Sequence, residues 1–238
     1  MFFSLATGQD TLFLLLWIAL AVRYQERGKP FIAGVFSPFC AMKFHLFMFL
    51  PLLFIGQRRW RMFGGAASGG LVLMAISFLA AGARWSLDYF ATLTNPVINP
   101  APGLMVNLHC LFHGISGGAA MELVSCLAVA VSVWLVMKKS TFLEGLAVIL
   151  VGGLLTSDHT YTGDCVLLVP ACAIIVSSMA DHWTVPWAAL ALFPALYAIL
   201  VGSTWAYGAQ VVIILLFCTS AAHLLRRPSP AAGGLAEE

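Results

Sequence analysis

The stretch FIAGVFSPFCAMKFHLFMFLPLLFIG, residues 31–56, decides the fold of this protein. It is long enough to cross a bilayer, because a spanning helix needs about 20 apolar residues. Four residues nevertheless interrupt the apolar run: Pro38, Lys43, His45 and Pro51. Basic residues also flank the stretch at both ends, which places both ends on the same side of a membrane. These features predict two half-helices of about a dozen residues that meet near Lys43 and form a re-entrant segment.

The rest of the chain is equally apolar. Hydrophobic residues make up 61% of the 238 residues and charged residues 9%, with a mean hydropathy of +0.94. A soluble domain is about a quarter charged, so these charges are too few to cover a water-facing surface. The composition therefore predicts an all-α fold, a polytopic transmembrane helix bundle that is surrounded by membrane lipids. The net charge of +2 gives no reason to expect a nucleic-acid partner.

Eight apolar runs predict seven or eight membrane helices: 11–22, 31–56, 63–81, 119–137, 141–156, 165–180, 185–203 and 208–225. Basic residues gather in four places: Arg23/Arg27/Lys29, Arg58/Arg59/Arg61, Lys138/Lys139 and Arg226/Arg227. The positive-inside rule assigns these clusters to the cytoplasm, and the loops 82–118, 157–164 and 204–207 to the outer side. We expect one transmembrane domain over residues 1–225 of a plasma (inner) membrane protein. A disordered cytoplasmic tail is expected over 226–238.

Lys43 is the polar residue that most needs a functional explanation. A lysine near the middle of a bilayer costs about 2.5–3.5 kcal/mol on insertion scales, and such residues usually face a site. Snorkelling to the interface would be strained, since about a dozen residues separate Lys43 from either end of its segment. Irregular backbone at this depth requires protein or a water-filled cavity around it. The sequence thus predicts a polar cavity in which Lys43 binds an anionic group such as a phosphate. For His45, a structural hydrogen bond and a role in the site both remain open.

The long outer loop 82–118 contains two features. Its start, with Trp85, is typical of an amphipathic helix at the membrane interface. Asn107, His109 and His113 follow, of which only the two histidines share a helical face, with no carboxylate near them in sequence. Two histidines alone do not support a metal site, and we expect none. Polar groups at a cavity mouth are the simpler interpretation.

The outer loop Ser-Asp-His-Thr-Tyr-Thr-Gly-Asp, residues 157–164, packs two carboxylates and an imidazole into eight residues. Asp158 beside His159 could act in acid–base chemistry, or the loop could be a hydrated turn. Glu122 and Glu144 are expected at the interface, and Asp181 with His182 is given no role. The sequence has no Walker loop, GxGxxG or HExxH motif, and no cofactor is expected.

Several strings occur in a characteristic order: Gly8-Gln9, Ala33-Gly34, Lys43, Arg58-Arg59-Trp60-Arg61, Asn107-Leu108-His109, and Ser157 to Asp164 running into Leu167-Leu168-Val169-Pro170. This series resembles glycosyltransferase family 87, the polyprenol-phosphate-sugar-dependent membrane mannosyltransferases and their relatives, over about residues 8–225. The resemblance implies a C-type glycosyltransferase fold. It also implies transfer of a hexose, such as mannose, from a polyprenyl-phosphate carrier to an acceptor on the outer face of the membrane.

The resemblance also implies roles for individual residues. Lys43 would contact the lipid phosphate, and His159 would be the catalytic participant from the loop 157–164. Asp158 is added as a catalytic candidate because of its own chemistry beside His159, since the family usually has proline at that position. The donor site would be completed by six further residues: Gln9, His45, Asn107, His109, Tyr161 and Asp164. In C-type enzymes a carboxylate in the first outer loop commonly serves as the base, and that loop belongs to an N-terminal half which this chain does not have. Asp10 is not assigned the role. The expectation is a hexosyltransferase truncated at the N-terminus, incomplete or inactive as this chain alone.

Two other functions fit the same features. A broken helix with a buried cation also suits a transporter or flippase of an amphipathic anion, although the sequence shows no internal repeat. A membrane scaffold without chemistry is the third alternative.

Overall fold

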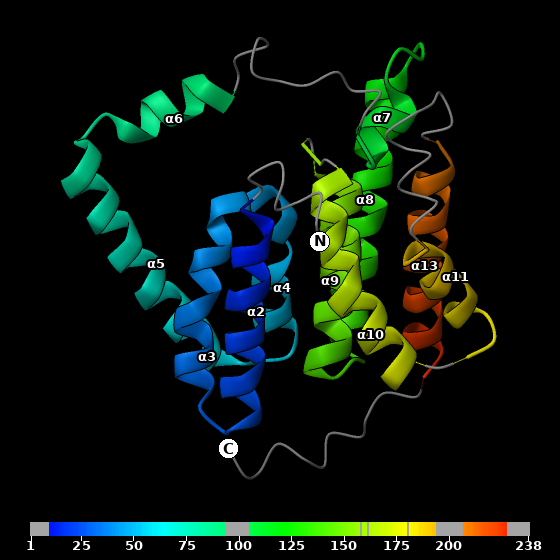
Figure 1. Cartoon of the computed structure of the whole chain (residues 1–238), viewed down its shortest axis with the longest axis horizontal. Coiled ribbons are helices and arrows are strands. Elements are labelled where there is room, and N and C mark those ends of the chain that lie inside the picture. Colours follow the sequence, from blue (N-terminus) through cyan, green and yellow to red (C-terminus); the bar gives the residue numbers. More distant parts are fainter. Residues whose placement is uncertain are drawn as a thin grey trace.

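The computed structural model describes residues 10–93, 105–157, 159–160, 162–179, 181–193 and 207–227, and every regular element in these ranges is a helix (Figure 1). The elements are α2 Thr11–Glu26, α3 Pro30–Phe36, the 3₁₀ helix η1 Ser37–Phe47, α4 Leu50–Gly56, α5 Trp60–Ala81, α6 Trp85–Leu93, α7 Leu108–Phe112, α8 Gly118–Met137, α9 Phe142–Thr156, the 3₁₀ helix η3 Thr162–Leu167, α10 Leu168–Ser178, α11 Thr184–Ala191 and α13 Tyr207–Arg226. The predicted all-α class is confirmed, and each of the eight apolar runs contains a helix.

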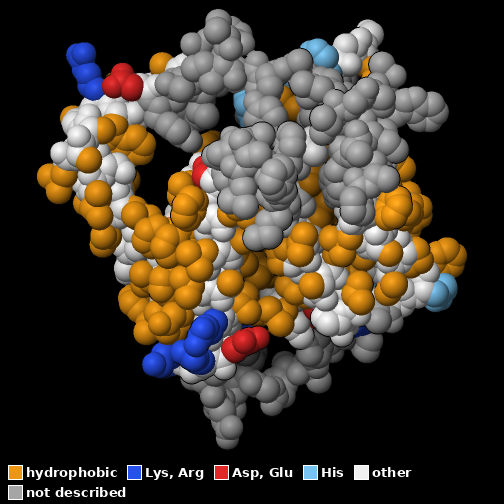
Figure 2. All heavy atoms as spheres, in the orientation of Figure 1, with side chains coloured by type: hydrophobic (Ala, Val, Ile, Leu, Met, Phe, Trp, Pro, Cys, Tyr) orange, Lys and Arg blue, Asp and Glu red, His pale blue; other side chains and the backbone are white. Residues whose placement is uncertain are grey.

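Four described helical stretches are long and apolar enough to cross a membrane: Pro30–Phe47, Trp60–Ala81, Gly118–Met137 and Tyr207–Arg226. The apolar stretches Phe142–Thr156 and Thr162–Ser178 are shorter. Large apolar side chains such as Leu79 of α5 and Val124 of α8 are mostly exposed. Figure 2 shows hydrophobic side chains covering the flank of the molecule along α5. A surface of this kind requires lipid around it, so the chain is a polytopic membrane protein.

Residues 31–56 form three helices, α3, η1 and α4, with a break at Lys43, whose φ of −129° and ψ of 64° are not helical. The packing of α3 on α5 shows which way the chain runs between these two helices. A Cβ added to Gly65 would lie 2.0 Å from the carbonyl oxygen of Phe31, and one added to Gly69 would lie 2.9 Å from that of Val35. Because these contacts advance together along both helices, α3 and α5 run parallel. The chain between them must therefore come back toward the end at which α3 began.

Small residues make this close contact possible. A Cβ on Gly34 would lie 2.0 Å from the carbonyl oxygen of Met62, so the backbones of α3 and α5 approach as closely as glycine permits. The start of α5 is rich in glycine, and Gly65 and Gly69 are the two buried glycines at which α3 lies close. Gly64, in contrast, has no atom within 4 Å of where its Cβ would be.

One end of the bundle, which we call the basic end, collects the arginine and lysine clusters. The Gln57 side-chain amide donates to the carbonyl oxygens of Ser140 and Thr141, both at 3.0 Å. Lys139 Nζ donates to the carbonyl oxygen of Leu225 at 2.7 Å. The clusters around Arg58, Lys138 and Arg226 are therefore neighbours. Figure 2 shows further Lys and Arg side chains at the lower end of the view, beneath α2 and α3.

The helix α9 forms the centre of the bundle. Nearly all of its residues are buried, and it contacts η1, α4, α8, α10 and α13. With 16 and 15 residues, α2 and α9 are only about 24 and 22 Å long, against a bilayer core of about 30 Å. Both reach the basic end, so their other ends, near Asp10 and Thr156, lie at similar depth. The break at Lys43 lies at that level.

Candidate functional site

Lys43 lies within contact distance of two carboxylates and a hydroxyl. Its Nζ is 2.6 Å from Asp164 Oδ1, 3.1 Å from Asp10 Oδ1 and 3.1 Å from Thr11 Oγ1. The Thr11 hydroxyl also donates to Asp164 Oδ1 at 2.7 Å. We call these four residues the ion cluster. It joins the start of α2, the break in η1 and the start of η3, which are far apart in the sequence.

Local structure explains why these side chains meet. The non-helical backbone of Lys43 kinks the chain between the two parts of η1. Asp10 is the N-cap of α2, where the partial positive charge of the helix favours a carboxylate. Its side chain makes no capping bond, and its Oδ1 instead contacts Lys43. A buried ammonium needs such counter-charges, since an unpaired charge in an apolar interior costs several kcal/mol.

The members of the ion cluster differ in exposure. The side chain of Asp164 is 1% exposed, that of Lys43 14% and that of Asp10 36%. The cluster contains one ammonium and two carboxylates, so it carries one surplus negative charge. An ammonium has three N–H groups to donate, and the three other members of the cluster all lie within 3.1 Å of Lys43 Nζ. Asp164 is the buried counter-ion of Lys43, and Asp10 is the more exposed of the two carboxylates.

Two histidines of the predicted site also come together. The ring centroids of His45 and His159 are 6.4 Å apart, and both side chains are half-buried. The His159 amide donates to Ser157 Oγ at 3.2 Å. The segment that carries Lys43 therefore touches the loop 157–164, from which Asp164 also comes. Lys43, His45, His159 and Asp164 belong to one region of the molecule.

Asn107 has a structural position. Its side chain is fully buried, donates to the carbonyl oxygen of Ser157 at 2.6 Å and accepts from the Cys110 amide at 3.0 Å as the N-cap of α7. The Val106 amide donates to the carbonyl oxygen of Thr160 at 3.3 Å. These bonds fasten the start of α7 to the loop that carries His159.

His109 has a partner that the sequence did not suggest. Its Nδ1 lies 3.0 and 3.1 Å from the two carboxylate oxygens of Glu122, and its ring is 5.7 Å from that of His113. Glu122 is 13 residues from His109 in the sequence, and the packing of α8 against α7 brings it to the histidine pair. No group of three or more His, Cys, Asp or Glu residues suited to a metal ion occurs in the described ranges.

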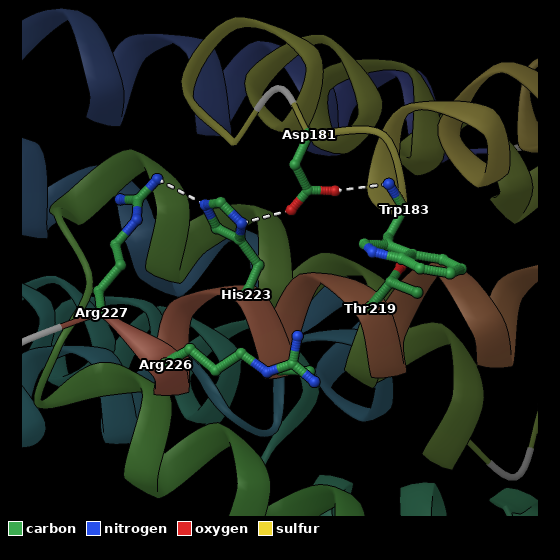
Figure 3. Close-up of a pocket in the computed structure, with 7 residues that line it drawn as sticks. Asp181, Trp183, Thr219, His223, Arg226 and Arg227 are labelled. Carbon is green, nitrogen blue, oxygen red and sulfur yellow. Dashed lines mark hydrogen bonds and ion pairs between the residues drawn. The ribbon is translucent and has the colours of Figure 1, made fainter.

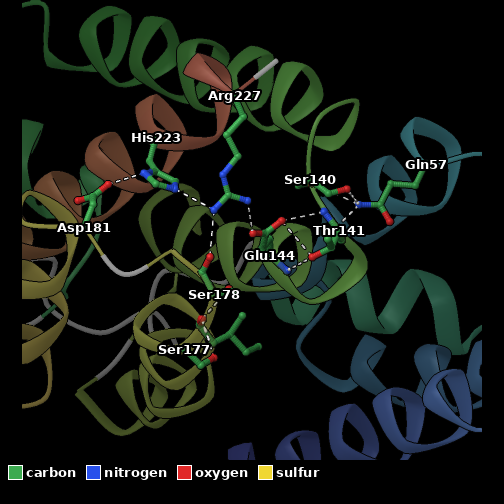
Figure 4. A network of polar contacts seen from close by, with 10 residues as sticks. Gln57, Ser140, Thr141, Glu144, Ser177, Ser178, Asp181, His223 and Arg227 are labelled. Atoms are coloured by element: carbon green, nitrogen blue, oxygen red, sulfur yellow. Dashed lines mark hydrogen bonds and ion pairs between the residues drawn. The ribbon is translucent and has the colours of Figure 1, made fainter. Parts of the chain in front are cut away.

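Glu144 lies in the first turn of α9, near the end of the helix, and it is only 2% exposed. It forms a capping box with Thr141 at the start of α9, and its Oε1 lies 2.5 Å from Arg227 Nη1. Figure 4 shows the polar network around this pair, in which Asp181 and His223 also take part. No role for Asp181 follows from local sequence, because its partner His223 lies far away in the chain.

Three predicted site residues, Gln9, Asp158 and Tyr161, lie outside the described residues. Two members of the ion cluster, Asp10 and Thr11, were missed. A signal for Asp10 existed: a buried lysine requires a carboxylate, and Asp10 opens the first apolar helix on the side assigned to the outside.

The fold and the ion cluster define a class: a polytopic helical membrane protein with a lysine–carboxylate cluster at the break in η1. The family model of Glycosyltransferase family 87 matches residues 1–158, more than half of the chain, and the protein belongs to this family. The matched range contains Asp10, Thr11 and Lys43, whereas Asp164 lies beyond its end. No curated protein and no solved structure matches the chain. The protein is thus a membrane protein of a glycosyltransferase family.

Proposed function

We propose that this protein transfers a hexosyl group, of the mannosyl type, from a polyprenyl-phosphate sugar to an acceptor on the outer face of the plasma membrane. We further propose that residues 31–56 are re-entrant, that the architecture is of the C-type, and that the ion cluster is the reacting site. The observation that carries the proposal is the 2.6 Å contact between Lys43 and Asp164 at the break in η1. A cation at this depth is costly, and such residues generally belong to a site.

Binding of the donor phosphate requires an exchange of partners at Lys43. Asp164, Asp10 and Thr11 lie within hydrogen-bond distance of its Nζ, and a phosphate oxygen would take the place of one of them. The contact with Asp164 is the shortest and is buried. Asp10 is the more exposed carboxylate and lies at 3.1 Å, which makes it the group that a phosphate displaces. Lys43 then lies between the buried carboxylate and the phosphate.

The same exchange provides a base. Once displaced, Asp10 is a free carboxylate beside the bound donor. The acceptor hydroxyl oxygen attacks the anomeric carbon and its proton passes to Asp10, while the bond from that carbon to the phosphate oxygen breaks. The electron pair of this bond remains on the phosphate, where the Lys43 ammonium stabilises the added charge. This assignment replaces the expectation that the base must come from another part of the enzyme.

The remaining polar groups suit the sugar. His45 and His159, with Asp158, are assigned to the hydroxyl groups of the hexose, since imidazole both donates and accepts hydrogen bonds. His45 lies two residues from Lys43, and His159 lies five residues from Asp164. A sugar attached to a phosphate on Lys43 would therefore lie between them.

A reconstituted assay tests this function. The full chain is placed in liposomes with a polyprenyl-phosphate hexose carrying a labelled sugar, and labelled product is counted. We expect Lys43→Met to abolish transfer, and Lys29→Met, which removes an exposed lysine at the basic end, to leave it unchanged. Transfer by Lys43→Met at the rate of the unsubstituted protein would contradict the proposal.

A second variant separates loss of activity from loss of folding. Lys43→Met alone leaves Asp164 buried without its partner, whereas Lys43→Met/Asp164→Asn removes both charges and should insert and fold. The proposal requires the double variant to be folded and inactive as well. Uptake of the labelled compound into liposomes without any glycosidic product would support transport instead.

A further inference from the structure

We propose a second ligand site at the basic end of the bundle, which binds the phosphate group of an anionic phospholipid. A pocket of about 640 Å³ lies there between α13 and the turn before α11 (Figure 3). It is lined by Asp181, Trp183, Thr219, His223, Arg226 and Arg227. Its volume lies within the range of about 300–1,000 Å³ that is usual for small-molecule sites.

Most of the charges around this pocket are already paired. Arg227 Nη1 contacts Glu144 Oε1 at 2.5 Å, and Arg227 Nη2 donates to the carbonyl oxygen of Ser178 at 3.0 Å. The same Nη2 lies 2.8 Å from His223 Nε2, while His223 Nδ1 pairs with Asp181 (Figure 4). A guanidinium can only donate, so Nε2 accepts and Nδ1 carries the proton that Asp181 binds. Arg227, His223 and Asp181 thus form the walls of the pocket.

Arg226 is different. It is exposed, and it makes no hydrogen bond or ion pair within the part of the chain that the structure describes. Figure 3 shows its guanidinium extending along α13 on the side of Thr219. Arg226 therefore brings to the pocket a guanidinium charge that no hydrogen bond or ion pair among the described residues engages. A guanidinium offers two parallel N–H groups to a phosphate, which is the anion it binds best.

The surroundings favour a lipid as the source of the phosphate. The pocket lies at the basic end, where the loops hold the lysine and arginine clusters. The side chain of Trp183 is 62% exposed at its rim, and tryptophan is enriched where protein meets the headgroup region. Clustered basic residues beside a membrane helix attract anionic headgroups. A headgroup phosphate on Arg226 with its glycerol beside Trp183 fits this arrangement.

Lipid binding to the purified full chain in detergent tests the site, and needs no sugar substrate. Native mass spectrometry measures retention of phosphatidic acid and of phosphatidylcholine. We expect preferential retention of phosphatidic acid, and about fivefold weaker retention by Arg226→Gln. Arg61→Gln removes an exposed arginine of the basic end that lies outside the pocket, and should change nothing.

Two results would overturn the proposal: equal retention of both lipids, or equal losses in Arg226→Gln and Arg61→Gln. Inorganic phosphate is added in a second arm to identify the source. Competition by millimolar phosphate would assign the site to a phosphate group alone, and absence of competition would assign it to the whole headgroup. Either outcome supports the pocket as the site if Arg226→Gln is the weaker binder. Transfer activity is not involved, so failure here leaves the proposed function untouched.

Discussion

Lys43 and Asp164 each supply the charge that makes the burial of the other possible. The Asp164 side chain is almost inaccessible, and its Oδ1 accepts from both Lys43 and Thr11. Breaking a buried pair by removing one partner typically costs about 3–5 kcal/mol, whereas removing both partners costs much less. The effects of substituting Lys43 and Asp164 on the free energy of unfolding should therefore not be additive.

A double-mutant cycle measures this coupling. We expect Lys43→Met to lower the free energy of unfolding by about 3–5 kcal/mol, because Asp164 is left without its cation. Asp164→Asn should cost less, since Asp10 still pairs with Lys43. The double variant should recover at least part of the loss caused by Lys43→Met, measured by thermal unfolding in detergent. Losses that simply add would show that the two groups do not interact.

At the scale of single elements, the contact between α9 and η1 holds the ion cluster in place. A Cβ added to Gly153 would lie 1.9 Å from the carbonyl oxygen of Leu46, three residues from Lys43. The backbone of η1 therefore lies directly on α9. Any side chain at residue 153 must push the two elements apart, and Lys43 would move with η1.

Gly153→Ala should accordingly impair both stability and transfer. Overpacking of this kind costs about 1–3 kcal/mol, and displacement of η1 separates Lys43 from Asp164. The matched control is Gly64→Ala in α5, whose new Cβ meets nothing within 4 Å. Alanine there should be neutral or stabilising, by up to about 1 kcal/mol, because it favours helix. If Gly153→Ala unfolds and transfers like Gly64→Ala, η1 does not depend on this contact.

The elements were largely predictable, because apolar runs and their interruptions follow from local sequence. The break at Lys43 was expected from Pro38, Lys43 and Pro51, and it is present. The pairing of Thr11 with Asp164, 153 residues apart, was not predictable, because it depends on how the helices are arranged. The same reason explains the missed pair of His109 and Glu122, which belong to different helices. Periodicity locates a helix but does not identify its neighbours.

At the scale of the whole molecule, the Glu144–Arg227 pair ties the end of α13 to the start of α9. The side chain of Glu144 is 3% exposed and that of Arg227 36%. We expect Arg227→Gln to destabilise the protein by about 3 kcal/mol, since Glu144 becomes an uncompensated buried charge. The adjacent Arg226→Gln should change stability by less than about 0.5 kcal/mol. Thermal unfolding of both variants tests this difference, and equal melting temperatures would contradict the role of Arg227 as the partner of Glu144.

Asp181 gives this end of the molecule a dependence on pH. Partial burial alone would raise the pKa of Asp181, but the backbone amides of Thr184 and Trp183 and the nearby His223 hold it below its usual range. A lowered pKa means that the carboxylate stabilises the fold above the ordinary aspartate pKa of about 4, and that this contribution is lost as the pH falls through the lowered value.

The comparison is between the unsubstituted protein and Asp181→Asn, with melting temperatures measured across pH. The difference should be largest near neutrality and should close below about pH 4. Repeating the series in a His223→Gln background removes the titration of the imidazole. In that background, the difference in melting temperature between the proteins with and without Asp181→Asn should still shrink as the pH falls. A difference that grows as the pH falls would contradict the lowered pKa of Asp181.

The most direct test of the account is turnover by Asp10→Asn, with Asp88→Asn on α6 as the control. If the ion cluster carries out transfer, Asp10→Asn should bind the polyprenyl-phosphate sugar at least as tightly as the unsubstituted protein, because the carboxylate that competes for Lys43 is gone. It should nevertheless transfer the sugar about 10²–10⁴ times more slowly, because the base is gone. Asp88→Asn should react at the unsubstituted rate. Equal turnover by the two variants would contradict the assignment of the cluster as the reacting site.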